Sequence, residues 1–375
     1  MRIVQNHLPF RSSMFDLRLQ EIALPGNSKD PDVLISWLID TLCLHRRRDE
    51  GVSTEGVYSP IHRTLKENLF ANPSIGFETR QLAEEMGLTP AAIHHHFSRL
   101  VNAGLITSTT SNGWRKYHLV GGSLTNAVEN MVGRAKMVQK QRLKQLTEYW
   151  QRGENTTLEI ELVDPEKPML LLRIREWSPA EEGQSNLSVF MADSGLLGER
   201  PGKEIIADSI TVKSFEMLLN SGPPLSIDEV ASGVNCSKPR VGRILERFRA
   251  TGLVERIART DRLATNLWSA MNTQYLRRGE DWMLKKGGFE RLNIDNSLFK
   301  KLKKNKLTPD DVHSKIKDIE PRDQMLLLNL LGGRLPYGYR LCGSNSSMME
   351  KRGADNLERI LRRITKVAET LEKIL

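Results

Sequence analysis

Cationic and polar side chains gather on two short segments that are spaced as amphipathic helices. In the first, Ile93, Phe97 and Leu100 stand at i, i+4 and i+7, which predicts a helix over residues 90–102 with one buried face. The other face, with the residue that caps the helix, carries groups able to hydrogen-bond to bases or phosphates: Thr89, His94, His95 and Arg99. In the second segment, residues 238–250, the comparable side chains are Lys238, Arg240, Arg243 and Arg247.

The two segments belong to an internal repeat. Leu82–Ile106 can be laid on Val230–Val254 without a gap, at a constant shift of 148 positions. Apolar positions fall on apolar positions, and Arg99 falls on Arg247. Each copy predicts a short helix, a tight turn and a second helix, which is a helix-turn-helix. The turn contains Gly87 in the first copy and Asn235 in the second, two residue types that tolerate a positive φ.

A β-hairpin is expected after each second helix. In the first copy, the predicted strands Thr107–Thr110 and Trp114–Val120 flank Asn112-Gly113, a strong hairpin signal. In the second copy, strands are expected over residues 254–258 and 263–268. The cations near these two predicted wings are Arg115, Lys116, Arg259 and Arg262.

Composition favours a polyanionic partner and gives no support to catalysis. Lys and Arg number 55 against 46 Asp and Glu, a net charge of +9. No Ser-His-Asp, Cys-His or paired-carboxylate arrangement stands out, so we expect no enzyme activity. Neighbouring His94, His95 and His96 point in different directions on a helix, and the three cysteines are far apart. We therefore expect neither a metal site nor a cofactor.

The run from Leu88 to Phe97, with the exit Ala103-Gly104-Leu105-Ile106, resembles the recognition helix of ArsR-type winged-helix regulators. The second copy resembles it more loosely. The resemblance implies major-groove contacts from His94, His95, Arg99, Arg240, Arg243 and Arg247. It implies phosphate contacts from Arg115, Lys116, Arg259 and Arg262. The paired cysteines of the family's metal sensors are absent, so metal sensing is not implied.

The remaining sequence is organised around these two units. We expect a mainly α fold with small β elements (α+β): two winged helix-turn-helix domains, a small central sheet and a C-terminal helical region. The central strands are expected at Leu158–Val163, Met169–Ile174 and Ser188–Ala192. The expected divisions are an N-terminal segment with one helix (1–58), winged helix-turn-helix 1 (59–122), a linker helix (123–150), a small acidic β domain (151–203), winged helix-turn-helix 2 (204–270), a basic helical region (271–350) and a C-terminal amphipathic or coiled-coil helix (351–375).

Two segments near the C-terminus have alternative interpretations. The last helix carries a heptad-like apolar seam at Leu357, Ile360, Ile364, Val367, Leu371 and Ile374. This seam either makes a homodimer or docks the helix on its own domain. The lysines between Lys300 and Lys306 form either a solvated helix face or a phosphate contact.

No segment is apolar over the length that a bilayer requires; the longest apolar run, Val33–Leu44, contains Asp40. The first ten residues do not resemble a signal peptide, so a cytoplasmic protein without a membrane partner is expected. Together these features predict a transcription regulator that binds specific double-stranded DNA through tandem winged helices. The alternatives are a replication initiator and a chromosome-associated assembly protein whose winged helices contact protein.

Overall fold

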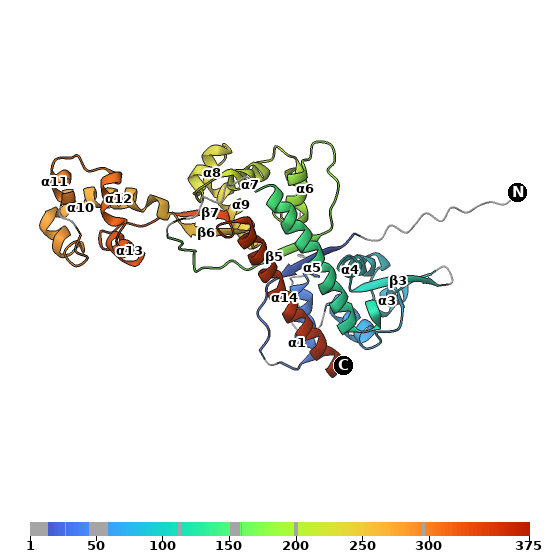
Figure 1. The fold of residues 1–375 in the computed structure, drawn as a ribbon. Helices are drawn as coiled ribbons and strands as arrows, with labels where there is room; N and C mark the ends of the chain where they lie inside the picture. The colour runs from blue at the N-terminus through green and yellow to red at the C-terminus, as the bar shows by residue number, and fades with distance from the viewer. Residues whose placement is uncertain are drawn as a thin grey trace.

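The computed structural model describes residues 14–26, 28–44, 59–111, 114–150, 158, 160–198, 202–294 and 297–375. Over these residues the chain is mainly helical with three small sheets, which confirms the expected fold class. Within these ranges, no helix is long and apolar enough to cross a membrane. Two parts meet along a pair of long helices, and a third, helical group extends from one of them (Figure 1).

The first part contains a helix-turn-helix followed by a hairpin. The helix-turn-helix is α3 (Thr79–Met86) and α4 (Pro90–Asn102). Strand β4 (Trp114–Leu119) lies between β2 (Phe77–Glu78) and β3 (Ile106–Ser111) in an antiparallel sheet. The other elements of this part are β1 (Asp16–Gln20), α1 (Pro31–Thr41), α2 (Pro60–Arg63), the π-helical η1 (Thr64–Phe70), the 3-10 turn η2 (Val120–Gly122) and α5 (Leu124–Glu148).

Local sequence explains the turn between α3 and α4. Gly87 ends α3 in the left-handed region, with φ of 65°. The Thr89 side chain then accepts a hydrogen bond from the Ala92 amide, and Pro90 occupies the first turn of α4. Buried Ile93, Phe97 and Leu100 fix the face of α4 that packs inward.

The second part repeats the order of elements. Its helix-turn-helix is α8 (Ile227–Gly233) and α9 (Lys238–Ala250), with Asn235 at φ of 48° in the turn. Strand β6 (Val254–Ala258) pairs with β7 (Tyr337–Leu341), and Leu225 forms a bridge to Tyr339 of β7. The remaining elements are β5 (Leu171–Arg175), α6 (Asn186–Asp193), the 3-10 helix η3 (Gly202–Ile205), α7 (Ile210–Asn220) and α14 (Ser346–Ile374).

The predicted second strand of the second wing was wrong. Residues 263–268 begin a helix, α10 (Leu263–Lys285), and the partner of β6 is β7, which follows only after residues 259–336. The intervening segment forms a helical module with its own apolar core, which includes Phe289 and Phe299. Its elements are the 3-10 turn η4 (Thr260–Arg262), α10, α11 (Ser297–Lys303), α12 (Pro309–Ile316) and α13 (Pro321–Leu330). We call residues 259–336 the inserted module.

The central strands differ from the prediction in part. Leu171–Arg175 is a strand, close to the predicted Met169–Ile174, and it pairs with β1 near the start of the chain. Ser188–Ala192 lies in α6 and was wrongly predicted as a strand, because the capping box at Ser185 starts a helix there. In the predicted strand Leu158–Val163, position 159 lies outside the described residues, and Val163 makes an isolated bridge to Ile257 of β6.

The long helices α5 and α14 pack side by side and run antiparallel. Thr125 near the start of α5 contacts Glu372 near the end of α14, and Lys136 pairs with Glu358. The predicted seam of α14 is buried from Leu357 to Leu371 and joins the core of the first part. The seam is therefore covered within one chain, which corresponds to the docked helix and gives no support to a homodimer through α14.

Candidate nucleic-acid interface

Helix α4 presents a polar face to solvent. His94 is exposed and His95 is partly exposed, one turn from the N-terminus of the helix. The Ser98 hydroxyl donates to the His94 carbonyl at 2.8 Å, so this serine satisfies its own helix. Thr89 is exposed, but its hydroxyl oxygen already caps the helix at 3.3 Å from the Ala92 nitrogen. The Ser98 hydroxyl also lies 3.4 Å from the Nδ1 atom of the exposed His94 ring.

The hairpin after α4 carries a cation and an aromatic ring at its outer end. Arg115 is exposed, and the neighbouring Trp114 keeps 55% of its surface exposed. Lys116 is partly buried, with its ammonium 3.8 Å from a carboxylate oxygen of Glu78. The predicted Asn112-Gly113 turn lies outside the described residues. Trp114 was not among the predicted site residues, although its outward position beside an Asn-Gly turn was visible in the sequence.

Helix α9 presents the more strongly cationic face. Arg240 and Arg243 are one turn apart and exposed, and neither makes an ion pair within the described ranges. Lys238 is 66% exposed, and its ammonium lies 2.9 Å from Asp228 of the preceding helix. This face can therefore offer two unpaired guanidinium groups and one weakly held ammonium to an anion.

Arg99 and Arg247, which the repeat aligns, have an internal role in both parts. Arg99 donates to the carbonyls of Cys43 and Leu44, at 3.2 and 3.0 Å, just after α1. Arg247 donates to the carbonyl of Leu197, at 3.1 Å, just after α6, and pairs with Glu204. Each guanidinium ties its helix to a neighbouring segment. These internal hydrogen bonds compete with the groove contacts predicted for the two arginines, which stay predictions.

Arg259 and Arg262 converge on one carboxylate. Arg259 is only 3% exposed and donates to Glu229 at 2.7 Å and to Asp261 at 2.8 Å. Arg262 donates to the other oxygen of Glu229 at 2.6 Å and stays 46% exposed. Burial acts to raise the pKa of Glu229, but hydrogen bonds from Ser226 and the two guanidinium groups hold it below its usual value. The predicted phosphate contact of Arg259 is corrected, because its guanidinium is buried and paired with Glu229 and Asp261.

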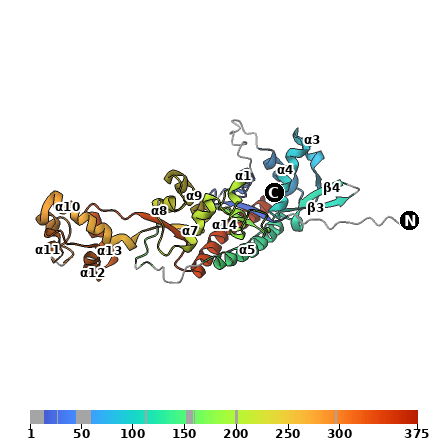
Figure 2. The same cartoon turned by 90° about the horizontal axis from the view of Figure 1, so that it is seen from above.

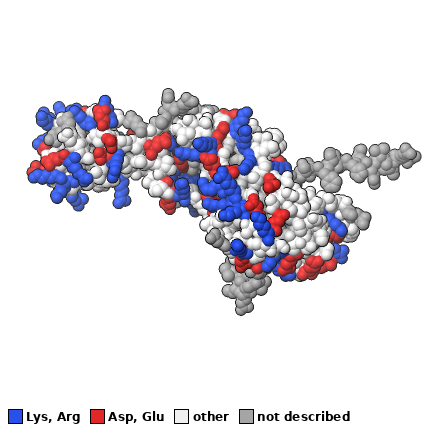
Figure 3. Space-filling model, turned by 60° about the horizontal axis from the view of Figure 1, so that its bottom comes forward, with Lys and Arg blue, Asp and Glu red and all other residues white. Residues whose placement is uncertain are grey.

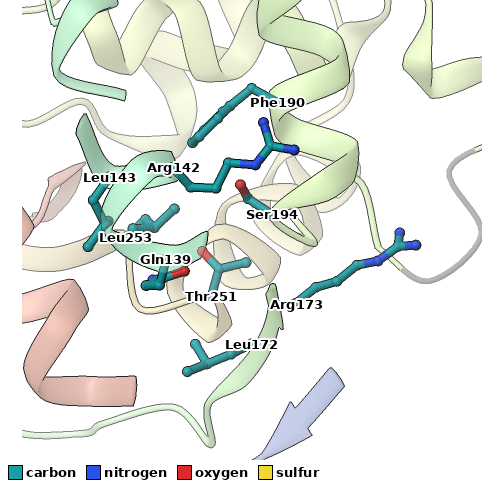
Figure 4. Close-up of a pocket in the computed structure, with 9 residues that line it drawn as sticks. All are labelled: Gln139, Arg142, Leu143, Leu172, Arg173, Phe190, Ser194, Thr251 and Leu253. Carbon is teal, nitrogen blue, oxygen red and sulfur yellow. The ribbon is translucent and has the colours of Figure 1, made fainter. Parts of the chain in front are cut away.

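A small cavity lies in the described part of the interior. It has a volume of about 10 Å³, space for about one water molecule, and lies where α5, β5, α6 and the end of α9 meet. Figure 4 shows Arg142, Ser194 and Thr251 around it. Arg142 donates to buried Asp193 and to the Arg175 carbonyl, which makes this a structural junction. Within the described ranges, no group of three His, Cys, Asp or Glu side chains is arranged to hold a metal ion.

One comparison with known proteins identifies the first helix-turn-helix. Residues 78–108 match the family model described as bacterial regulatory protein, arsR family. The matched segment covers α3, the turn, α4 and the beginning of β3, so the resemblance seen in the sequence is confirmed for this unit. The searches of curated proteins and of solved structures gave no match.

Proposed function

We propose that this chain is a transcription regulator that binds specific double-stranded DNA with α4 and α9 as recognition helices. The arsR-family match over residues 78–108 supports DNA binding and transcription regulation for the first unit. The observation that carries the proposal to the second unit is the exposed, unpaired Arg240 and Arg243 on the helix that occupies the same place as α4. We place the protein in the cytoplasm, without catalytic activity, cofactor or membrane partner.

The proposed contacts follow from the exposure of the side chains and, on α9, from the unpaired guanidinium groups. On the first unit, His94 and His95 face base edges while Arg115 and Lys116 contact the backbone, and Thr89 helps to place the helix start near a phosphate. On the second unit, Arg240 and Arg243 enter the groove, and Lys238 and Arg262 contact phosphates. Guanidinium groups suit both roles, since they donate in a planar fork to guanine or to phosphate.

The test is the salt dependence of DNA binding. The double variant Arg240→Glu, Arg243→Glu should weaken binding to a duplex selected by the protein from a random library. It should also shrink the affinity difference between that duplex and a scrambled one, since each base contact contributes about 1–3 kcal/mol of discrimination. The variant Lys238→Glu, Arg262→Glu, at the proposed phosphate contacts, should instead reduce the slope of log K against log salt by about 2, since each phosphate contact contributes roughly 0.9. The matched control is Arg362→Glu, Lys366→Glu, which makes the same charge change on exposed positions of α14.

Two results contradict the proposal. One is a wild-type affinity that does not change between about 50 and 200 mM salt, because the four proposed cationic contacts to phosphate should cost on the order of a hundredfold over that range. The other is an equal loss of binding in the α9 variant and in the α14 control, which would mean that only net charge matters.

A further inference from the structure

The correspondence between the two parts extends well beyond the helix-turn-helix. Strands β1 and β5 and helices α1 and α6 correspond at a shift of 155 positions, Asp16 to Leu171 and Pro31 to Asn186. The recognition helices correspond at 148. Strand β4 corresponds to β7, and helix α5 corresponds to α14, at a shift of 222 positions. The two strands end at Leu119 and Leu341, and the two helices follow them. The order of strands and helices from β1 to α5 is thus repeated from β5 to α14.

The contact between β1 and β5 is reciprocal. Leu17 faces Ile174, and Leu19 faces Leu172. At the shift of 155, Leu17 corresponds to Leu172 and Leu19 corresponds to Ile174, so the two pairs are equivalent. The flanking hydrogen bonds repeat the exchange, since the Glu21 amide donates to the Leu170 carbonyl and the Glu176 amide donates to the Phe15 carbonyl. Arg18 faces its own counterpart, Arg173. Such reciprocity is the mark of a two-fold axis, which here passes beside Arg18 and Arg173.

The contact between α5 and α14 is reciprocal in the same way. Lys136 pairs with Glu358, which is its own counterpart at the shift of 222. Helices that meet antiparallel at equivalent positions are related by a two-fold rotation. The buried faces also correspond, and six buried positions of α5 fall on buried positions of α14: Ala127 on Met349, Met131 on Gly353, Ala135 on Leu357, Val138 on Ile360, Arg142 on Ile364 and Leu146 on Ala368.

We infer that one chain carries both halves of a DNA-binding dimer and that it binds, alone, a DNA site made of two half-sites of unequal length. The inference rests on the proposed function. Helices α3, α4 and α8 lie on one side of α5, so both helix-turn-helices face away from the long helix pair in the same direction (Figure 2). In a two-fold arrangement, two recognition helices enter successive major grooves one helical turn, or a multiple of it, apart.

The inequality comes from the inserted module. The pair Thr110–Arg115 of the first hairpin corresponds to Ala258–Tyr337 of the second, so the module replaces a wing tip. The first hairpin and the module extend from the centre in opposite directions (Figure 1). Residues 259–336 hold sixteen Lys and Arg against ten Asp and Glu, a net charge of +6 out of the chain's +9. Lys and Arg crowd its surface (Figure 3).

The cations of the inserted module that are placed to meet a phosphate lie on and after α11. Lys301 pairs with Asp311, and Lys303 pairs with Glu280. Lys300, Lys304 and Lys306 are exposed and make no ion pair within the described residues. Leu298, Phe299 and Leu302 bury the other face of α11, which keeps the lysines outward. Beside the second half-site, these three lysines would extend the contact along the DNA backbone on that side only.

The experiment measures stoichiometry and footprint on the selected duplex. Mass photometry should find one chain per duplex, and hydroxyl-radical footprinting should show two protected segments separated by about one or two helical turns. Additional protection should flank one segment only. The full-length variant Lys300→Glu, Lys304→Glu, Lys306→Glu should lose that flank and keep both segments. The control Lys140→Glu, Lys144→Glu, Lys366→Glu, with exposed positions on α5 and α14, should keep all three.

Different failures are distinguishable. Two chains per duplex, a single protected segment, or a flank that persists in the lysine variant would overturn this inference while the proposed function stands. A chain that selects no duplex from the library would overturn the proposed function and this inference together.

Discussion

Replacing Arg99 by alanine tests whether this arginine stabilises the fold or contacts DNA. In the structure, its guanidinium donates hydrogen bonds to the carbonyl oxygens of Cys43 and Leu44, just after α1, and the substitution removes both. Hydrogen bonds from a charged donor contribute about 1.5–3 kcal/mol each. Because the side chain is only partly buried, we expect Arg99→Ala to lower the free energy of unfolding of the first part by about 2–4 kcal/mol. Arg247→Ala should act in the same way on the second part, through Leu197 and Glu204.

Urea unfolding, followed by hydrogen exchange of residues 38–44, measures the effect on stability. The salt slope of DNA affinity measures the effect on binding, and for Arg99→Ala it should stay within about 0.5 of the wild-type slope. Arg80→Ala is the matched control, since that arginine is 70% exposed and pairs only with Glu84 one turn away among the described residues. A variant with unchanged stability and a slope reduced by about 0.9 would refute the structural role and indicate that Arg99 contacts DNA instead.

Three further predictions concern the carboxylates that join the two parts, two glycines of the long helices, and the carboxylate that pairs with Arg259. Hydrogen bonds from Arg359, Lys136 and Thr125 lower the pKa of Glu21, Glu358 and Glu372; burial acts to raise the pKa of Asp16, but Arg173 leaves it lowered. The stabilisation by these carboxylates is therefore complete above the ordinary carboxyl pKa of about 4 and is lost as the pH falls through the lowered pKa values. A pair of distance labels on α5 and α14 should report separation of the two helices below about pH 4, and at a higher pH in the Asp16→Asn variant. Separation that begins near neutral pH would contradict this. Gly133→Ala should raise the free energy of unfolding by about 0.5–1 kcal/mol, because the added Cβ meets nothing within 4 Å. Gly353→Ala should not show this gain, because its Cβ would lie 2.9 Å from the Leu143 side chain. Equal gains for the two variants in calorimetry would show that the Leu143 side chain moves aside at no cost in stability. Glu229→Gln should cost about 1–3 kcal/mol by leaving buried Arg259 with one carboxylate, whereas Asp228→Asn, at an exposed neighbour, should be close to neutral in the same denaturation assay.

The helix-turn-helices were predictable because local signals determine them. Gly87, Thr89 and Pro90 mark the turn, and the spacing of Ile93, Phe97 and Leu100 gives the buried face. The constant shift of 148 revealed the repeat where no insertion interrupts it. Past Ala258 the repeat no longer predicts the structure, because the pairing partner of β6 lies beyond the inserted module and a helix begins where the second strand was expected.

The roles of the arginines were not predictable in the same way. Spacing puts Arg99 on the same side of α4 as the histidines, but its partners are carbonyls after α1, a contact that only the tertiary fold creates. Likewise the sequence predicts Arg259 to be a cation of the second wing, whereas the fold pairs it with Glu229, thirty positions earlier. Sequence pattern identifies which residues can bind an anion, whereas long-range packing decides which of them are already occupied.

In the DNA-binding mode inferred above, the contact between α5 and α14 sets how occupancy of the DNA site depends on the concentration of the protein. A regulator assembled from two separate chains fills its site in proportion to the square of its concentration when free chains dominate, since pairing must precede binding. Here the two halves are tethered by one backbone, so their meeting is intramolecular and independent of dilution. In the DNA-binding mode inferred above, occupancy of the DNA site would rise in direct proportion to the number of chains, and a change in one half, such as the inserted module, would not have to be matched in the other.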